Sequence, residues 1–194
     1  MIIIKALEEK IKKDGKVLPG DILQVSNFLN HQIDPNIMRE IGIEIARLYK
    51  DTGVTKILTV ESSGVAIALA AALEMNVPFV FAKKGHPSNI SKDTYSAEVR
   101  SFTKGNVNRI SVSREYLNST DKVLIVDDFL AKGEALNGLI SIAEDAGATV
   151  AGAAIAIEKG YQGGGDQIRS RGIRVESLAI VDKMYDDDLE FRPQ

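Results

Sequence analysis

This sequence of 194 residues contains no cysteine, which excludes disulfide bonds, thiolate metal sites and cysteine nucleophiles. The formal net charge is −3, so the chain lacks the basic excess that is typical of general nucleic-acid binding. The longest apolar stretches, residues 65–73 and 150–157, fall short of the roughly 18 residues that a membrane span needs. No apolar region of the signal-peptide type develops after Met1. We therefore expect a cytoplasmic protein without a nucleic-acid or membrane partner.

Common nucleotide-binding and metal-binding motifs are also missing. The kinase phosphate-loop motif G-x-x-x-x-G-K-[ST] does not occur. The triple glycine at residues 163–165 lacks the G-x-G-x-x-G spacing, and we interpret it as a flexible turn before Asp166. His31 and His86 stand far apart without the spacing of metal ligands, so the sequence does not support a zinc site.

What the sequence does contain is a regular alternation of strand-like and helix-like segments. Short apolar runs of strand length occur at residues 56–60, 79–82, 123–126, 150–157 and 174–181. Helical patterns occur at residues 36–49, which follow an Asp34-Pro35 cap, at 64–75 and 134–146, and near the N-terminus. Runs that are apolar on both faces and alternate with helices predict an α/β fold, with a mostly parallel sheet flanked by helices on both sides.

Two segments interrupt this alternation, in a chain whose length and lack of repeats or linkers predict a single domain. Residues 83–104 are polar and have little periodicity, which predicts a long loop that is either functional or disordered. Residues 18–30 form a mixed stretch before the Asp34 cap.

The segment VLIVDDFLAKGEAL, residues 123–136, is the strongest functional signal. A buried strand is predicted to end at Val126, with Asp127 and Asp128 directly after it, where ligands bind in parallel α/β sheets. The small residues that follow let the backbone approach a ligand, and the N-terminus of the next helix favours a phosphate. Because carboxylates repel a phosphate, the pair must face sugar hydroxyls or Mg²⁺, and the segment predicts a phosphorylated ribose site. The alternative is that the acids only cap the helix.

This segment resembles the phosphoribosyl-diphosphate binding motif of type I phosphoribosyltransferases, in which two acids follow a hydrophobic strand. The chain has Lys132-Gly133-Glu134-Ala135 where many members have threonine-glycine-glycine-threonine, so phosphate binding relies more on backbone amides. Five further segments resemble the bacterial members that use xanthine: SNFLNHQIDP, TVESSG, PFVFAKK, SFTK and AIEKGYQ. The likeness covers nearly the whole chain and is weakest after Val181.

The resemblance implies a type I phosphoribosyltransferase fold in one domain of residues 1–194. Its core is expected at about 35–157, and its small hood at about 1–34 and 158–194. The implied reaction is the magnesium-dependent transfer of ribose 5-phosphate from phosphoribosyl diphosphate (PRPP) to N9 of xanthine. The products are xanthosine 5′-monophosphate (XMP) and pyrophosphate. We expect Mg²⁺ to bind mainly through the substrates, without protein ligands, and the protein to form a homodimer.

The same resemblance assigns roles to individual residues. Asp127 and Asp128 are the expected catalytic residues, which hold the ribose hydroxyls and favour positive charge on the sugar ring. The residues expected to bind PRPP are Ala131, Lys132, Gly133, Glu134, Ala135, Glu61, Ser62, Ser63 and Gly64. The residues expected to bind xanthine are Leu23, Asn30 and Lys159, because a base with two carbonyl oxygens needs hydrogen-bond donors beside an apolar contact. Tyr161 is a candidate for stacking on the base.

Several of these assignments have alternatives. Ser62 or Ser63 can instead cap the helix that follows. The loop at 83–104 is expected to close over the reaction, with Lys83, Lys84 and Lys104 near the pyrophosphate, but each lysine can equally be a solvated surface residue. The base can be hypoxanthine, guanine or adenine, which the acid pair does not distinguish. A regulator that senses PRPP while binding nucleic acid is a further alternative, although the chain has no helix-turn-helix region or basic excess.

Overall fold

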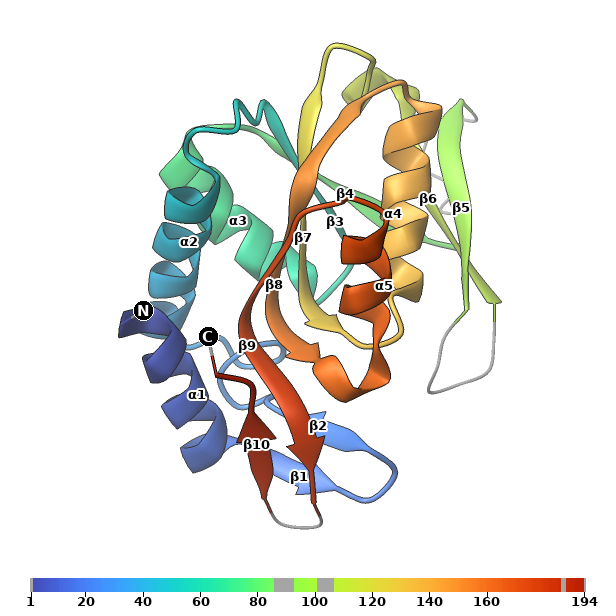
Figure 1. Cartoon of the computed structure of the whole chain (residues 1–194). Helices are drawn as coiled ribbons and strands as arrows, with labels where there is room; N and C mark the ends of the chain where they lie inside the picture. Colours follow the sequence, from blue (N-terminus) through green and yellow to red (C-terminus); the bar gives the residue numbers. More distant parts are fainter. Residues whose placement is uncertain (1, 86–92, 101–106, 186–187, 194) are drawn as a thin grey trace.

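The computed structural model describes residues 2–85, 93–100, 107–185 and 188–193. Within these residues, eight strands form one sheet in the order β10-β9-β8-β7-β3-β4-β6-β5 (Figure 1). The strands are β3 (Lys56–Val60), β4 (Phe79–Lys84), β5 (Thr94–Arg100), β6 (Val107–Ser113), β7 (Lys122–Leu130), β8 (Thr149–Lys159), β9 (Val175–Met184) and β10 (Leu189–Phe191). The run from β9 to β4 is parallel, whereas β10, β6 and β5 pair antiparallel with their neighbours. The mostly parallel sheet confirms the predicted fold class.

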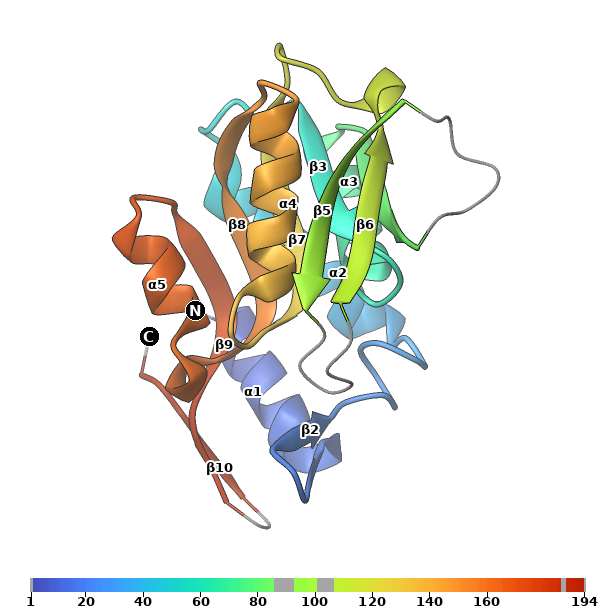
Figure 2. The ribbon, with the colours of Figure 1, turned by 90° about the vertical axis from the view of Figure 1, so that its right-hand side faces the viewer.

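Helices cover both faces of this sheet (Figures 1 and 2). They are α1 (Ile2–Asp14), α2 (Pro35–Tyr49), α3 (Gly64–Met75), α4 (Glu134–Asp145) and α5 (Gly164–Ser170), with short 3₁₀ turns η1 (Arg114–Tyr116) and η2 (Gly160–Gln162). One hydrophobic core lies between the sheet and α1, α2 and α3, and a second between the sheet and α4. Val123 and Ile125 of β7 join the α4 core, while Leu124 and Val126 join the other. Strand β7 is apolar throughout this stretch because both of its faces are buried.

The predicted cap of α2 is confirmed. The Asp34 carboxylate accepts hydrogen bonds from the backbone N–H groups of Asn36 and Ile37, at 3.0 and 3.4 Å, and Pro35 occupies the first helical position. These contacts satisfy amides that have no partner inside the helix. The cap therefore sets where α2 begins, directly after the loop that carries Asn30.

A two-stranded antiparallel hairpin, β1 (Lys16–Leu18) with β2 (Ile22–Gln24), stands apart from the main sheet. Together with α1 it lies near the end of the sheet at which β9 ends (Figure 1). The boundaries of the hood and core, and the single-domain division, stay predictions.

The prediction that residues 83–104 form a long loop is wrong for most of the residues that the structure describes in this range. Strand β4 continues to Lys84, and residues 94–100 form β5, which pairs with β6 from Thr94 to Arg100. Tyr95, Ala97 and Val99 alternate along β5 and pack against the α4 core, so the strand has the period of two that a partly buried strand needs. Lys104 and residues 86–92 lie outside the described part of the chain.

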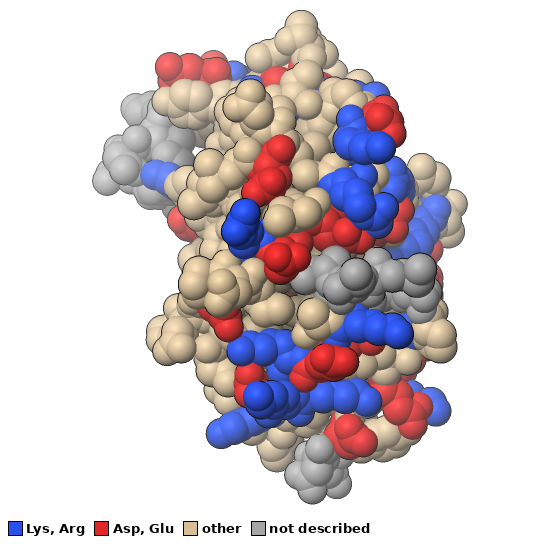
Figure 3. All heavy atoms as spheres, turned by 90° about the vertical axis from the view of Figure 1, so that its left-hand side faces the viewer, with Lys and Arg blue, Asp and Glu red and all other residues tan. Residues whose placement is uncertain are grey.

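The chemical character of the surface agrees with the near-neutral charge. On the face that carries α1 and α2, basic and acidic side chains are interspersed (Figure 3). Among the described residues, no helix has both the length and the apolar character to cross a bilayer.

Candidate active site

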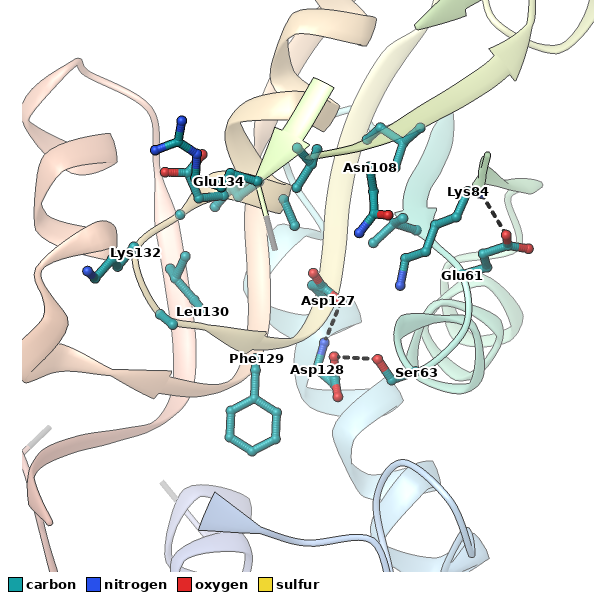
Figure 4. A pocket seen from close by; sticks show the side chains of 18 residues that line it. Glu61, Ser63, Lys84, Asn108, Asp127, Asp128, Phe129, Leu130, Lys132 and Glu134 are labelled. Carbon is teal, nitrogen blue, oxygen red and sulfur yellow. Dashed lines mark hydrogen bonds between the residues drawn. The ribbon is translucent and has the colours of Figure 1, made fainter. Parts of the chain in front are cut away.

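The predicted acid pair lies inside β7 and not after it, which corrects the predicted strand end at Val126. The strand continues because its parallel pairing with β8 extends to the register of Leu130 with Glu158. Asp127 and Asp128 are each only 6% exposed. The backbone N–H of Asp128 donates to Asp127 Oδ1 at 2.9 Å (Figure 4). Two neighbouring carboxylates are thus held at the carboxyl end of a central strand.

Asp128 is fixed by side chains from two distant segments. Ser63 Oγ donates to its Oδ1 at 2.8 Å, and Asn30 Nδ2 donates to its Oδ2 at 2.9 Å. Each carboxylate oxygen therefore has a donor, which fixes the orientation of the carboxylate. The helix-capping alternative for Ser63 is not observed, because its side chain makes no capping hydrogen bond to α3.

Asp127 has a less favourable environment for a charge. Burial raises the pKa of its carboxyl well above the usual value, the charge of Asp128 raises it further, and Lys84 lowers it only in part. The pair therefore resists carrying two negative charges in the absence of a cation. Positive charge arising next to it would relieve that repulsion, which is the chemical property expected of a site that stabilises a cationic sugar ring.

The segment Ala131–Ala135 forms a tight loop that leads into α4. Gly133 has a φ of 85°, a left-handed conformation that glycine adopts without strain, and α4 begins at the next residue. Gly133 is buried, whereas Lys132 and Glu134 are exposed. The N-terminal turn of a 12-residue helix thus faces the same cavity as the acids, and its backbone amides favour an anion.

The glycines at 163–165 hold this loop in place, and the predicted flexible turn is wrong for two of them. Gly164 and Gly165 are buried in α5, and Gly164 N donates to Ala131 O at 3.2 Å. A Cβ on Gly164 would lie 2.3 Å from Ala131 O and 2.5 Å from Lys132 C. Only glycine permits this close approach of α5 to the loop. The run of three glycines in the sequence indicates that the backbone is special here, but the run alone does not distinguish a flexible turn from a close approach of two segments.

Glu61 and Ser63 form the opposite wall, whereas Ser62 and Gly64 of the same segment do not line the cavity. Glu61 Oε1 accepts a hydrogen bond from Lys84 N at 2.6 Å, and the peptide bond between Glu61 and Ser62 is cis. Ser62 is exposed, and Gly64 is buried against the acids. A Cβ on Gly64 would lie 2.3 Å from Thr59 Oγ1 and 2.9 Å from Asp127 Oδ1. The start of α3 is therefore packed directly onto β7.

These parts line one cavity of about 260 Å³ (Figure 4). Its walls include Glu61, Ser63, Lys84, both aspartates and all five residues of the loop 131–135. Arg100 and Asn108, from β5 and β6, also line it, in a region where the sequence pattern predicts no strands. Lys83 is not among the lining residues. In the described part of the chain, no cluster of three or more His, Cys, Asp or Glu side chains is arranged to hold a metal ion.

Of the three residues predicted to bind the base, Asn30 is the one shown in contact with a residue of this cavity. Asn30 contacts Asp128, as described above. Leu23, in β2, is buried in the hydrophobic core. Lys159, at the end of β8, donates from Nζ to the backbone oxygen of Asp21, and burial lowers its pKa although Asp21 opposes the shift. None of the three lines the cavity itself, and their role in base binding stays a prediction.

The fold and site define an α/β protein with an acid pair and the loop 131–135 at the carboxyl ends of parallel strands. Such edges of parallel sheets are where ligands bind. The phosphoribosyl transferase domain family matches residues 24–181. The xanthine phosphoribosyltransferase of Limosilactobacillus reuteri is 51% identical over 97% of this chain and 98% of its own, and that of Oceanobacillus iheyensis is 48% identical over 98% of each. The chain belongs to the phosphoribosyltransferase family.

Solved structures support the same fold. The adenine phosphoribosyltransferase of Rhodothermus marinus matches with a TM-score of 0.74 and 22% identity, over 93% of this chain and 99% of its own. That of Giardia lamblia matches with a TM-score of 0.75 and 20% identity, over 90% and 96%. At this level of identity the match supports the fold alone.

Proposed function

We propose that this protein transfers ribose 5-phosphate from PRPP to N9 of xanthine, producing XMP and pyrophosphate in purine salvage. The single observation that supports this reaction most directly is that the acid pair of β7 and the loop 131–135 line one cavity. We call residues 131–135 the phosphate-type loop, because their backbone amides at the start of α4 favour an anion. The choice of xanthine is supported by relatives of that name at about half identity over nearly the whole chain. Adenine, hypoxanthine and guanine are the alternative bases.

In this proposal Asp127 and Asp128 hold the ribose hydroxyls. The bond from C1′ to the pyrophosphate oxygen breaks, the bond from C1′ to N9 forms, and the N9 proton leaves. The positive charge that develops on the ring is favoured by the buried carboxylates, because electrostatic effects are strong where water is excluded. The backbone of residues 131–135 binds the 5-phosphate, and Glu61–Gly64 with Lys84 lies where the pyrophosphate leaves.

Mg²⁺ fits the donor chemistry of this cavity. Carboxylate oxygens of Glu61, Asp127 and Asp128 line it, and hard oxygen donors suit this ion. Because no three of the described His, Cys, Asp or Glu side chains are arranged to hold a metal ion together, we propose that the ion is held mainly through the oxygens of PRPP and pyrophosphate. When bound, it neutralises charge on the pyrophosphate.

Xanthine recognition is assigned to Leu23, Asn30 and Lys159. Asn30 and Lys159 supply N–H donors for the oxygens at C2 and C6, and Leu23 supplies an apolar contact. A donor-lined site disfavours guanine, whose 2-amino group is itself a donor. Because Asn30 also donates a hydrogen bond to Asp128, it would connect the base with the catalytic pair in this assignment.

We further propose a homodimer formed through α3 and β4. Leu69 and Leu73 lie one turn apart on α3 and are 47% and 72% exposed, and Phe81 of β4 is 36% exposed. The ring centroids of Phe79 and Phe81 are 6.4 Å apart, and Phe79 lines a shallow depression together with Leu69 and Leu73. A second copy of the chain is the occupant that we assign to this apolar face.

A cytoplasmic location is part of the proposal. Both PRPP and XMP are highly charged and do not cross membranes unaided, so an enzyme that uses one and makes the other is expected where both are kept.

The test is an assay with Mg²⁺ and PRPP in which xanthine, hypoxanthine, guanine and adenine are offered separately. We expect a strong preference for xanthine and release of pyrophosphate. Preference for another purine would overturn the base assignment but leave the ribose and phosphate sites. Tight PRPP binding without turnover of any base would instead favour a PRPP-sensing regulator.

A further inference from the structure

Asp21 lies at an unusual position in the hairpin of β1 and β2. The strands are joined by residues 19–21, and Asp21 has a φ of 65°, after Gly20 with a φ of 84°. Among non-glycine residues, aspartate and asparagine adopt this left-handed conformation most readily. The turn carries the Asp21 side chain toward the end of β8.

Three donors from one short segment converge on Asp21. Lys159 Nζ donates to its backbone oxygen, Tyr161 Oη donates to Oδ1 at 2.5 Å, and Gln162 Nε2 donates to Oδ2. Lys159 Nζ also lies 4.0 Å from Oδ2. The donors lie within four consecutive residues, at the end of β8 and in η2, about 140 positions from Asp21 in the sequence. A single residue of the hairpin thus occupies the donors of that segment.

The chemistry of this contact matches that of an oxo-purine. Asp21 presents three acceptor oxygens to the ammonium, phenol and amide groups, and a purine with two carbonyl groups presents acceptors of the same kind. Under the proposed function, Lys159 faces the base. Asp21 and the base would then compete for the same donors.

We propose that Asp21 is an internal competitor of the base, which holds Lys159, Tyr161 and Gln162 until an oxo-purine displaces it. This inference rests on the proposed function. Since base binding requires the contact to open, the apparent affinity is lowered by the fraction of molecules in which it is closed. Asp21 thereby sets the affinity for the base without contacting it.

Gln162 provides an independent reason why the base can win this competition. Its Oε1 is buried and has no hydrogen-bond partner in the described part of the chain. A carboxylate has only acceptors, so Asp21 cannot satisfy this oxygen. An oxo-purine carries N–H groups next to its carbonyl oxygens and can satisfy both atoms of the amide. A base with an exocyclic amino group in place of a carbonyl would set a donor against donors.

Kinetic measurements on Asp21→Asn and Asp21→Gly test the proposal. Asparagine keeps the shape and tolerates the positive φ, and glycine removes the side chain without backbone strain. We expect the KM for xanthine to fall by about threefold to tenfold in Asp21→Gly, and by less in Asp21→Asn, with the KM for PRPP unchanged. A rise in the KM for xanthine, or no change, would overturn the proposal, since Asp21 would then position Lys159 or have no part in binding.

Glu190→Ala is the matched control. Glu190 is also a hairpin carboxylate that accepts from a lysine and a tyrosine, Lys183 at 3.1 Å and Tyr185 at 2.9 Å. Its removal is expected to leave both KM values unchanged. A fall in the KM for xanthine in this variant as well would contradict a specific role of Asp21.

Hydrogen–deuterium exchange tests the Asp21 contact without any base, so its result does not depend on whether xanthine is the substrate. Without any base, Asp21→Gly is expected to exchange the backbone amides of residues 16–24 several-fold faster than the wild type, because the hairpin loses its contact with η2. Unchanged exchange would show that Asp21 does not hold the hairpin. If the wild type prefers hypoxanthine or guanine, the choice of xanthine fails, and the fall in KM is measured with that purine instead. A preference for adenine, which has no carbonyl oxygen, would overturn this proposal.

Discussion

Asp127 shows how one residue can serve chemistry at the expense of stability. Its carboxyl is buried next to another carboxylate, and both conditions raise its pKa. Folding therefore favours the protonated form of Asp127 more than the unfolded chain does, because the unfolded chain ionises at the usual value. The stabilisation that comes from this proton is present at low pH and is lost as the pH rises through the folded-state pKa.

Asp127→Asn is expected to lower kcat/KM by about 10²–10³-fold, because a neutral amide cannot stabilise a cationic ring. The same change is expected to increase the free energy of unfolding at neutral pH, since it removes a carboxylate that is unfavourable when ionised. The gain should shrink as the pH falls from about 8 to about 4, which urea unfolding at several pH values would measure.

Asp121→Asn is the control for this prediction. Asp121 is also buried, but it accepts from Lys56 Nζ at 2.8 Å. The neutral amide leaves the Lys56 ammonium without its counter-ion, so this variant should lose stability and keep activity. A stability loss in both variants would contradict the raised pKa of Asp127.

At the scale of elements, short-range packing of α5 positions the phosphate-type loop. The helix is only seven residues long, yet it approaches the backbone of residues 131–133 through Gly164 and reaches Glu158 of β8 through Arg169. Glu158 is 1% exposed and accepts from both Arg169 and Ser177. The phosphate-type loop is thus supported by a neighbouring helix.

Gly164→Ala is expected to raise the KM for PRPP by about tenfold or more, because the added Cβ would displace Ala131 and Lys132. Gly163→Ala serves as the control: Gly163 has a φ of 76° and no atom within 4 Å of its Cβ position. That variant should lose about 1 kcal/mol of stability and keep its KM. Equal KM values in the two variants would show that α5 does not position the loop.

Glu158→Gln is expected to lower the free energy of unfolding by about 3 kcal/mol, since it leaves Arg169 without its buried counter-ion. In contrast, Glu176→Gln breaks the exposed pair with Arg174 and should cost about 0.5 kcal/mol or less. Chemical denaturation of both variants measures the difference. Similar losses would mean that burial of Glu158 does not strengthen its ion pair.

At the scale of the whole molecule, the sheet and its two cores leave an apolar face on α3 and β4. Residues that serve no core and lie exposed together are typical of an interface between protein chains. Helix α3 begins at the proposed pyrophosphate loop, and Leu73 lies near its C-terminal end.

Leu73→Asp is expected to shift the protein from dimer to monomer in sedimentation velocity, with association weakened by about tenfold or more. Tyr116→Asp, at a residue of η1 that is 53% exposed, is the control and should not change the sedimentation coefficient. A wild type that sediments as a monomer would contradict the proposed dimer.

The sequence by itself determined the parallel α/β fold, the approximate boundaries of α2, α3 and α4, and the presence of an acid pair beside a phosphate-type loop. These features are local: strand and helix periods, an Asp34 cap, and one continuous segment that carries both acids and the loop. Residues that are neighbours in the chain remain neighbours in any fold, so a continuous motif survives folding.

Only the tertiary structure decided which partners these residues meet. Asn30 and Ser63 lie 98 and 65 positions from Asp128, Gly164 packs against Ala131, and Asp21 meets Lys159 across 138 positions. The pairing of β7 with β8 also placed the acids inside a strand and not after it. Such contacts depend on how whole elements pack, and the burial of Asp127 depends on all of them together, which no local pattern contains.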